Sequence, residues 1–391
     1  MQIPRLLLPI SANSAPARPP KLAPSWSSTL DSAMSSPLDE LPEPERLRAF
    51  DSLAESALKA WKLQAVALRR IACRENAVYE VQLEGGRRLA LRVHRYGYHD
   101  RISLQSELTW MRALAMADIA TPTVVPTPAG DVAVEVASDK VSVPHLCDML
   151  AWVEGRPLGS AEDPSSLGRG KTFETYCRVG RMAARIHRHS ATWQAPEGFL
   201  RPAWDRQGCL GRAALWGPWF DLDVLESNER HVLSAAAEVL DRTLLQFGKR
   251  REVYGLVHAD FVPDNLLEHD GRVVVLDFDD SGYGWYLWEL ATAVFWYLDT
   301  PHYVPALEGY IAGYREVRPL PDDELRLLPQ FLLMRALVYM GWMQTRRTQA
   351  TALRFTGRVR EISFALAERV LAGNLDYRSI PLELSPLPEG V

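Results

Sequence analysis

The sequence predicts an α+β fold with two lobes, in which a small antiparallel sheet with one packed helix precedes a larger, mainly helical lobe. Short apolar runs typical of strands dominate residues 66–153, and long runs with helical spacing dominate from about residue 155. A chain of 391 residues with 47% hydrophobic content can also bury enough apolar surface for two globular units. These observations favour a two-lobed protein.

The domain boundaries follow the same changes of pattern. Residues 1–37 are rich in Pro, Ser and Ala and lack periodicity, so we expect a disordered N-terminal extension. One interpretation is a targeting segment, because Arg5 precedes an apolar run. The other, favoured by the prolines that break this run, is an over-extended start with Met34 as initiator. We expect the first lobe over residues 38–153, the second over residues 154–374, and a C-terminal tail over residues 375–391.

The first lobe is expected to begin with an amphipathic helix over residues 43–62, where apolar residues recur at helical spacing. A second helix is expected over residues 103–117, because Leu104, Leu108 and Met111 share one face. Strands are expected in five apolar runs, at residues 66–71, 78–83, 89–93, 132–136 and 146–153. After its leading helix, this lobe is therefore a small sheet with one helix laid on it.

Long helical patterns fill the second lobe, at residues 173–187, 231–247, 286–298, 325–346 and 356–371. Only one stretch interrupts them. It contains two short apolar runs around Asp270 and Gly271, a dipeptide that indicates a two-residue hairpin turn. We therefore expect one β-hairpin within a helical lobe.

The segment around this hairpin carries the most informative motif of the chain. His258, Asp260 and Asn265 form an H-x-D-x-x-x-x-N pattern, and Asp277-Phe278-Asp279 follows the second apolar run. Phosphoryl transfer needs a carboxylate that orients and deprotonates the attacking hydroxyl. It also needs an amide and a second carboxylate that hold magnesium on the triphosphate. The spacing therefore predicts a phosphoryl-transfer site, and the alternative is a set of ordinary turn residues beside two strands.

The expected hairpin register brings the two metal ligands together. A two-residue turn pairs His269 with Arg272. Counting back along both strands places Asn265 next to Asp277, so two oxygen ligands arrive within metal-bridging reach. We interpret His258 as a buried, hydrogen-bonded scaffold residue rather than a proton-transfer group.

The strand at residues 89–93 supplies the nucleotide half of the site. Its side chains alternate, so Ala90 and Arg92 share one face, where a small residue leaves room for adenine and a cation reaches phosphate oxygens. Glu107 lies near the apolar face of its helix, where an unpaired carboxylate is costly, so we expect it to pair with Arg92. Asn76, in the glycine-free turn after the first strand, is a further candidate for phosphate contact. The alternative is that Arg92 and Glu107 are ordinary surface residues.

With these residues in place, positions 38–373 resemble the aminoglycoside phosphotransferase and choline kinase superfamily, nearest the bacterial type II homoserine kinase, hydroxylysine kinase and stress response kinase A group. The resemblance rests on the H-x-D-x-x-x-x-N pattern and on the D-F-x-D signature at residues 277–286, followed by Glu289. It implies a protein-kinase-like fold with Asp260 as base, Asn265 and Asp277 as magnesium ligands, Arg92 as the counterpart of a strand lysine, and Glu107 as its ion-pair partner. Arginine departs from the lysine of most kinases, because its guanidinium is a rigid fork.

The resemblance implies an enzyme that uses ATP and Mg²⁺ to phosphorylate a hydroxyl of a small, cationic metabolite or an aminoglycoside-like compound. Several acids could receive an ammonium group and several aromatic rings could face a cation, although most such residues are solvated acids or core. The acids are Asp205, Asp221, Asp223, Glu226, Asp279 and Asp280, and the aromatic residues are Trp204, Trp216, Trp219, Tyr283, Trp285 and Trp288. Two alternatives stay open: a protein serine/threonine kinase of the stress response kinase A type, and a non-catalytic nucleotide-binding protein.

Composition argues against several other classes of protein. The net charge of −5 at pH 7 and the isoelectric point near 6.0 argue against nucleic acid as a partner. The four cysteines are dispersed without a C-x-x-C pair, which favours reduced thiols in the cytoplasm over a disulfide frame or zinc site. The longest apolar stretch, residues 290–298, has about half the length that a bilayer requires, so we expect no membrane span.

Overall fold

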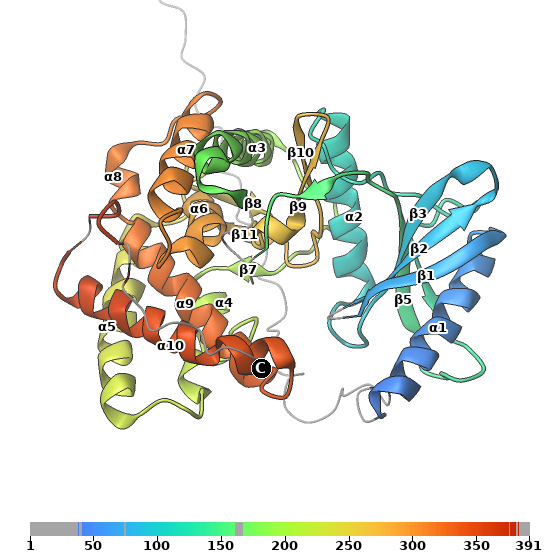
Figure 1. Cartoon of the computed structure of the whole chain (residues 1–391), viewed down its shortest axis with the longest axis horizontal. Helices are drawn as coiled ribbons and strands as arrows, with labels where there is room; N and C mark the ends of the chain where they lie inside the picture. Colours follow the sequence, from blue (N-terminus) through green and yellow to red (C-terminus); the bar gives the residue numbers. More distant parts are fainter. Residues whose placement is uncertain are drawn as a thin grey trace, which may run out of the picture.

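The computed structural model describes residues 38, 41–73, 76–160, 167–374, 376–380 and 382. These residues form two lobes that lie side by side, one built on a sheet and the other mainly helical (Figure 1). The expected extension, residues 1–37, lies outside the described residues, as does most of the expected C-terminal tail. The predicted α+β architecture, a sheet lobe followed by a helical lobe, is confirmed.

A five-stranded antiparallel sheet forms the smaller lobe, with the strand order β1-β2-β3-β5-β4. α1 (Glu43–Ala60) covers one face of this sheet, where Leu53 and Ala57 are buried in one cluster with Tyr79. Because side chains alternate along β3, Ala90 and Arg92 belong to the opposite face. The strands are β1 (Ala65–Cys73), β2 (Ala77–Leu83), β3 (Arg88–Val93), β4 (Ala133–Val136) and β5 (His145–Ala151).

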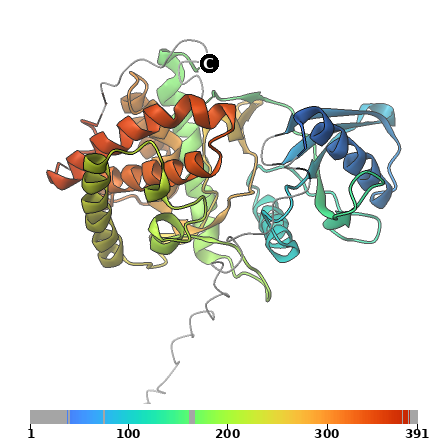
Figure 2. The same ribbon diagram turned by 90° about the horizontal axis from the view of Figure 1, so that it is seen from below.

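α2 (Arg101–Met116) lies on the other side of the sheet from α1, between the two lobes (Figures 1 and 2). Its buried Leu104, Leu108 and Met111 join the large core that continues into the helical lobe. The helix expected to lie on the sheet is therefore mainly a bridge between the lobes, and α1 is the helix that closes the apolar face of the sheet. The sequence pattern shows that α2 is amphipathic but not which partner it covers.

The helical lobe contains α3 (Thr172–Thr192), α4 (Arg206–Leu210), α5 (Ser227–Phe247), α6 (Tyr286–Val294), α7 (Tyr303–Arg315), α8 (Asp322–Leu325), α9 (Leu328–Thr345) and α10 (Ala350–Leu371). The helix expected over residues 286–298 ends at Val294 and continues as the 3-10 turn η7 (Phe295–Tyr297). α7 lies outside the expected helices, because Gly309 and Gly313 interrupt its apolar pattern. None of the described helices is both long and apolar enough to cross a bilayer.

The glycines of α7 allow it to pack very closely against α3. A Cβ atom at Gly309 would overlap the backbone carbonyl of Phe173, and one at Gly313 would overlap that of Cys177. The approach is reciprocal, because a Cβ atom at Gly180 of α3 would overlap a backbone carbonyl of α7. The residues that weaken the helical pattern of α7 therefore permit its main packing contact.

Replacing Gly313 by alanine is expected to destabilise the protein by about 1–3 kcal/mol, because the added methyl group must push α7 away from α3. Urea-induced unfolding measures the change. Gly357→Ala in α10 is the matched control, since a Cβ atom there meets nothing within 4 Å and alanine favours a helix by about 1 kcal/mol over glycine. Equal stability of the two variants would contradict the close helix contact.

Two small sheets lie within the helical lobe. One contains β10 (Arg272–Val275), β9 (Leu266–His269) and β6 (Arg156–Pro157), and the other contains β7 (Ala203–Trp204), β11 (Gly282–Trp285) and β8 (Tyr254–Val257). The prediction that only the hairpin interrupts the helices is therefore wrong. The strands of the second sheet are too short to show an alternating pattern in the sequence.

The hairpin of β9 and β10 has the predicted register. His269 pairs with Arg272, and the backbone N–H that follows β10, at Leu276, donates to the carbonyl of Asn265 at 2.8 Å. Asp270 and Gly271 have φ values of 48° and 75°, which are typical of a type I′ turn. The chemistry of this turn thus sets where the site residues meet.

Candidate active site

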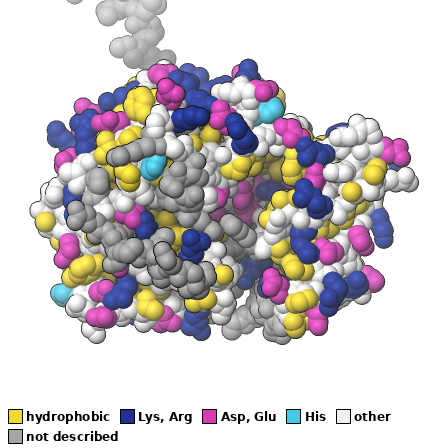
Figure 3. All heavy atoms as spheres, in the orientation of Figure 1, with side chains coloured by type: hydrophobic (Ala, Val, Ile, Leu, Met, Phe, Trp, Pro, Cys, Tyr) yellow, Lys and Arg dark blue, Asp and Glu magenta, His cyan; other side chains and the backbone are white. Residues whose placement is uncertain are grey.

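The two lobes meet at a hollow in which acidic side chains are visible (Figure 3). β8 and β11 are antiparallel neighbours, with Val257 opposite Gly282. This pairing brings the loop after β8, which contains Asp260, against the loop before β11, which contains Asp277. The hairpin between these two loops supplies Asn265. One region of β structure therefore collects the three residues of the predicted phosphoryl-transfer motif.

Asp260 is held at both oxygens of its carboxylate. Oδ2 accepts a hydrogen bond from Asn265 Nδ2 at 2.8 Å, and Oδ1 accepts one from Arg335 Nη2 at 2.9 Å. The side chain remains 24% exposed, so a hydroxyl group can still reach it. Sequence reasoning missed Arg335, which comes from α9, 75 residues along the chain.

Asn265 and Asp277 fit a divalent cation. Asn265 uses its amide nitrogen on Asp260, and its Oδ1 accepts no hydrogen bond from the described residues. Desolvation and the charge of Asp279 raise the pKa of Asp277 well above its ordinary value, with Asp260 and Asp280 adding to the effect. A bound cation would relieve this repulsion, and carboxylate and amide oxygens are the donors that Mg²⁺ prefers.

His258 is a buried scaffold residue, which confirms its interpretation from the sequence. Its Nε2 lies 2.7 Å from the carbonyl oxygen of Leu276, and its Nδ1 accepts a hydrogen bond from the backbone N–H of Asp260 at 3.3 Å. Burial lowers the pKa of His258, which favours a neutral ring with the proton on Nε2. The ring thus ties the loop of Asp260 to the residue that precedes Asp277.

Glu289, in the first turn of α6, supports the same loop. Its Oε1 accepts a hydrogen bond from the backbone N–H of Ala259 at 2.6 Å, and Ala259 has a φ of 69°, uncommon for a residue with a Cβ atom. Burial raises the pKa of Glu289 to about 8. This carboxyl group therefore stabilises an unusual backbone conformation next to Asp260.

The raised pKa of Glu289 makes stability depend on pH. A carboxyl group whose pKa rises from 4.5 to about 8 on folding contributes most stability below pH 4.5 and loses it as the pH rises toward 8. Glu289→Gln keeps an oxygen acceptor for Ala259 but does not titrate. Between about pH 5.5 and pH 7.5, we expect the wild type to lose stability relative to this variant by at most about 1.4 kcal/mol per pH unit. Urea unfolding at both pH values measures this difference, and a difference independent of pH would contradict the assignment.

Arg92 lies inside a buried network. Its Nη2 donates to Glu107 Oε1 at 2.8 Å, the expected ion pair, and its Nε lies 3.0 and 3.1 Å from the two carboxylate oxygens of Asp148. The three side chains are at most 7% exposed. The alternative that Arg92 and Glu107 are surface residues is therefore wrong.

Asp148 is the partner of Arg92 that sequence reasoning missed. It lies in β5 directly opposite Arg92 of β3. His94 Nε2 lies 2.6 Å from its Oδ2. Although burial opposes the change, Arg92 and His94 lower the pKa of Asp148. The available signal was a charged residue inside an apolar strand, because a buried carboxylate requires a partner.

Ala90 and Asn76 lie at the two ends of the expected nucleotide region. Ala90 precedes Arg92 by two residues and has Leu150 of β5 opposite it. Asn76 directly precedes Ala77, which pairs with Val93 at the end of β3. Asn76 therefore lies near the end of β3, whereas Ala90 lies closer to its beginning. Its Oδ1 is buried without a hydrogen-bond partner among the described residues. Asn76 thus stays a candidate for phosphate contact.

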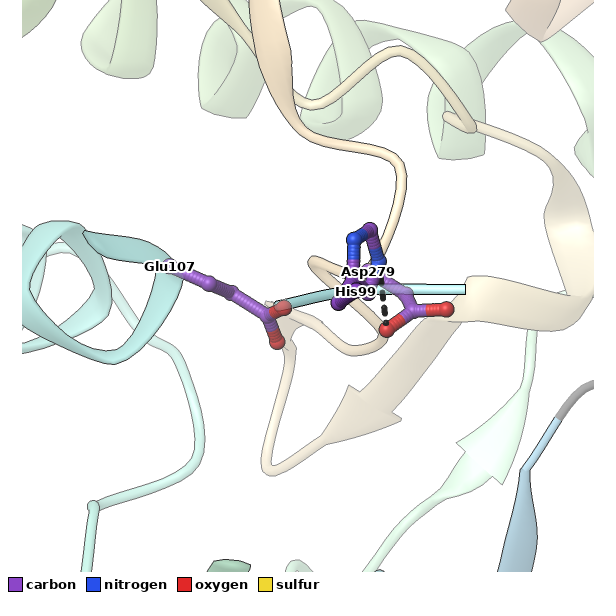
Figure 4. Close-up of side chains that lie close together, drawn as sticks. All are labelled: His99, Glu107 and Asp279. Carbon is purple, nitrogen blue, oxygen red and sulfur yellow. Dashed lines mark ion pairs between the residues drawn. The ribbon is translucent and has the colours of Figure 1, made fainter. Parts of the chain in front are cut away.

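Figure 4 shows a second cluster, formed by His99, Glu107 and Asp279. One donor atom from each residue lies within 4.8 Å of the others, and His99 Nε2 is 3.2 Å from Asp279 Oδ1. Cationic neighbours already balance these acids. Glu107 lies 2.8 Å from Arg92 and 3.7 Å from Arg201, and His99 lowers the pKa of Asp279 although burial opposes the change. We interpret this cluster as a charge-balanced link between the lobes rather than a metal centre.

Arg201 completes the link between the lobes. The side chain is buried, and its Nε donates to the carbonyl of Ser281 at 2.6 Å. Its Nη1 donates to the carbonyl of Ser103 at 3.1 Å, and its Nη2 binds the carbonyl of Asp279. One side chain therefore joins the loop after Asp277 to the first turn of α2.

The acids and aromatic residues expected around the acceptor have different roles. Asp205 caps α4 and pairs with Lys249 at 2.6 Å, and Glu226 caps α5. Asp280 and Trp216 instead contact each other next to Arg335, the partner of Asp260, with Trp216 Nε1 donating to Asp280 Oδ1 at 3.0 Å. Five of the six aromatic residues are part of the buried core: Trp204, Trp216, Trp219, Trp285 and Trp288.

The fold and the site together define the class of protein. A sheet lobe and a helical lobe with Asp260, Asn265 and Asp277 between them are the parts of a protein-kinase-like phosphotransferase. Residues 67–322 match the phosphotransferase enzyme family (APH), and the chain belongs to this family. The predicted relation to aminoglycoside phosphotransferases is thereby confirmed, and the protein is an enzyme that phosphorylates small-molecule hydroxyl groups.

Known relatives agree with this assignment. The structure is similar to that of the microcompartment-associated aminopropanol kinase, with a TM-score of 0.73 and 34% identity over 83% of this chain and 98% of that one. The amicoumacin kinase hAmiN, in complex with AMP-PNP, Ca²⁺ and Ami, has a TM-score of 0.66 and 21% identity over 84% of this chain and 96% of that one. The amicoumacin kinase of Bacillus subtilis (strain 168) is 24% identical over 301 residues, which cover 74% of this chain and 83% of that protein.

Proposed function

We propose that this protein transfers the γ-phosphoryl group of ATP to the hydroxyl of a small amino alcohol, with Mg²⁺ as the metal. The observation that carries this proposal is the catalytic carboxylate of Asp260, held by Arg335 and by the same Asn265 whose Oδ1 is left for a cation. The similarity to an aminopropanol kinase supports an amino alcohol as acceptor. The AMP-PNP and Ca²⁺ of the amicoumacin kinase complex support a nucleotide and a divalent cation.

In this mechanism, Asp260 accepts the proton of the acceptor hydroxyl as its oxygen attacks the γ-phosphorus and the bond to the leaving ADP oxygen breaks. Arg335 and Asn265 fix the carboxylate, so little freedom is lost when the hydroxyl is aligned. Asn265 and Asp277 would hold the metal, which would neutralise negative charge on the phosphates. The proton finally leaves Asp260 for solvent.

The nucleotide half of the mechanism depends on Arg92. Glu107 and Asp148 bind its Nη2 and Nε, whereas its Nη1 makes no hydrogen bond to the described residues. That nitrogen is therefore the one left for a phosphate oxygen. Ala90, on the same face of β3, leaves room for the adenine ring.

We also propose a cytoplasmic location and no nucleic-acid partner. All four cysteines are free thiols, as is typical of a reducing compartment. The net charge of −5 at pH 7 does not favour binding to a phosphate backbone.

Release of ADP from ATP and Mg²⁺, measured against a panel of acceptors, tests the proposal. The panel contains 1-amino-2-propanol, ethanolamine, homoserine, hydroxylysine, choline, an aminoglycoside and a generic protein substrate. We expect a small amino alcohol to give the highest kcat/KM. Phosphorylation of the protein alone would favour the serine/threonine protein kinase, and ATP binding without turnover on any acceptor would favour a non-catalytic protein.

A further inference from the structure

We propose that Asp280 binds the ammonium group of the acceptor, and that Arg335 prevents a quaternary ammonium group from binding beside Asp260. This inference rests on the proposed function, because it concerns the acceptor side of the same site. It narrows the acceptor class from cationic alcohols in general to amino alcohols whose nitrogen carries N–H groups.

Asp280 is a carboxylate with neutral partners only. Its Oδ1 accepts hydrogen bonds from the hydroxyl of Tyr98 at 2.8 Å and from Trp216 Nε1 at 3.0 Å. Its Oδ2 accepts none from the described residues, and no described arginine, lysine or histidine forms an ion pair with it. The side chain is partly accessible. Such a carboxylate retains both charge and lone pairs for an ammonium group.

Asp280 is also connected to the reacting groups by direct contacts. The ring of Trp216, which binds Asp280, lies 4.9 Å from the guanidinium of Arg335, and Arg335 binds Asp260. Burial and the neighbouring charge of Asp260 raise the pKa of Asp280 to about 7, so a bound cation would stabilise its ionised form. A small amino alcohol can therefore direct its hydroxyl to one carboxylate and its ammonium group to the other.

Arg335 fills the aromatic box that would otherwise suit a quaternary cation. Its guanidinium lies 4.9 Å from the ring of Trp216, 5.2 Å from that of Trp288 and 4.2 Å from that of Tyr339. Aromatic rings around a cation are the usual means of binding quaternary ammonium groups. Here the protein supplies the cation itself, and its side chain is fully buried. A quaternary group would have to displace Arg335 and leave Asp260 without its cationic partner.

The two features select the same acceptors. An ammonium group with N–H bonds can donate to Asp280, whereas a trimethylammonium group has no N–H to donate. The occupied aromatic box removes the alternative way of binding the trimethylammonium group. Asp280 therefore favours acceptors whose ammonium group has N–H bonds, and Arg335 prevents the binding of acceptors whose ammonium group has none.

The test compares three acceptors, 1-amino-2-propanol, 1,2-propanediol and choline, with the wild type and with Asp280→Asn. We expect the wild type to prefer the amine over both others. In Asp280→Asn, kcat/KM for the amine should fall by about 10- to 100-fold while that for the diol changes little. A merely structural role of Asp280 would lower both values together. Asp241→Asn, which removes an acid of α5 paired with Arg206, is the matched control and should retain the wild-type preference.

Each outcome decides a separate point. If Asp280→Asn keeps the preference for the amine, the assignment of Asp280 is overturned. If choline is used as well as the amine, the role of Arg335 is overturned. If the variant does not fold, equal use of amine and diol by the wild type would still overturn the proposal. Failure of the proposed function itself is distinguishable, because the wild type would then phosphorylate none of the three acceptors.

Discussion

Asp260→Asn is expected to lower kcat by about 10²- to 10⁴-fold while ATP still binds. Asparagine keeps the size of the side chain but cannot accept the proton of the acceptor hydroxyl. The proposed nucleotide contacts come from Arg92 on β3, so nucleotide affinity should change little. Steady-state kinetics with 1-amino-2-propanol measures the first effect, and calorimetric titration with a non-hydrolysable ATP analogue measures the second.

Asp270→Asn is the matched control for this experiment. Asp270 lies in the turn of the same hairpin, its side chain is 89% exposed, and asparagine suits the left-handed backbone of a type I′ turn. We expect kcat to stay at the wild-type value. If Asp260→Asn kept more than about one tenth of wild-type kcat, Asp260 would not be the base.

Replacing Arg92 by methionine is expected to have the largest effect on stability, a loss of about 3–5 kcal/mol in the free energy of unfolding. Glu107 and Asp148 are fully buried, and both would lose the hydrogen bonds of the guanidinium. Glu107 would keep Arg201 at 3.7 Å and Asp148 would keep the ring of His94 at 2.6 Å. Arg92→Lys should fall between methionine and the wild type, because an ammonium group restores charge but not the planar fork that binds two carboxylates. Urea unfolding at neutral pH measures all three proteins.

An exposed ion pair provides the comparison. Arg181 pairs with Glu316 at 2.6 Å, and both side chains are more than a third exposed. Arg181→Met should therefore cost about 0–1 kcal/mol. If Arg181→Met and Arg92→Met lowered the free energy of unfolding by similar amounts, burial of the Arg92 network would not increase its contribution to stability, and the prediction would be wrong.

The parts of the structure that depend on local chemistry could be predicted from the sequence. The turn at Asp270 and Gly271 fixes the hairpin register through two left-handed residues, so the meeting of Asn265 with Asp277 follows from counting. The pair of Arg92 with Glu107 could be predicted because strand alternation and the inner face of a helix each identify one partner.

The remaining site residues depend on packing between distant segments. Arg335 reaches Asp260 only because α9 packs against the loop of Asp260. Arg335 is the one charged residue in an otherwise apolar helix, a pattern that predicts a buried arginine but not its partner. Arg201 joins the two lobes through backbone carbonyls, which leave no trace in the sequence. The partner of α2 was missed for a similar reason, since an amphipathic pattern shows that a face is buried but not by what.

Phosphoryl transfer to a small amino alcohol can be observed in ³¹P NMR spectra of the protein with ATP, Mg²⁺ and 1-amino-2-propanol, followed over time. We expect a new phosphomonoester resonance that grows as the γ-phosphate signal of ATP declines and the signals of ADP appear. Conversion of ATP to ADP and inorganic phosphate without a phosphomonoester, or an unchanged spectrum, would contradict this expectation.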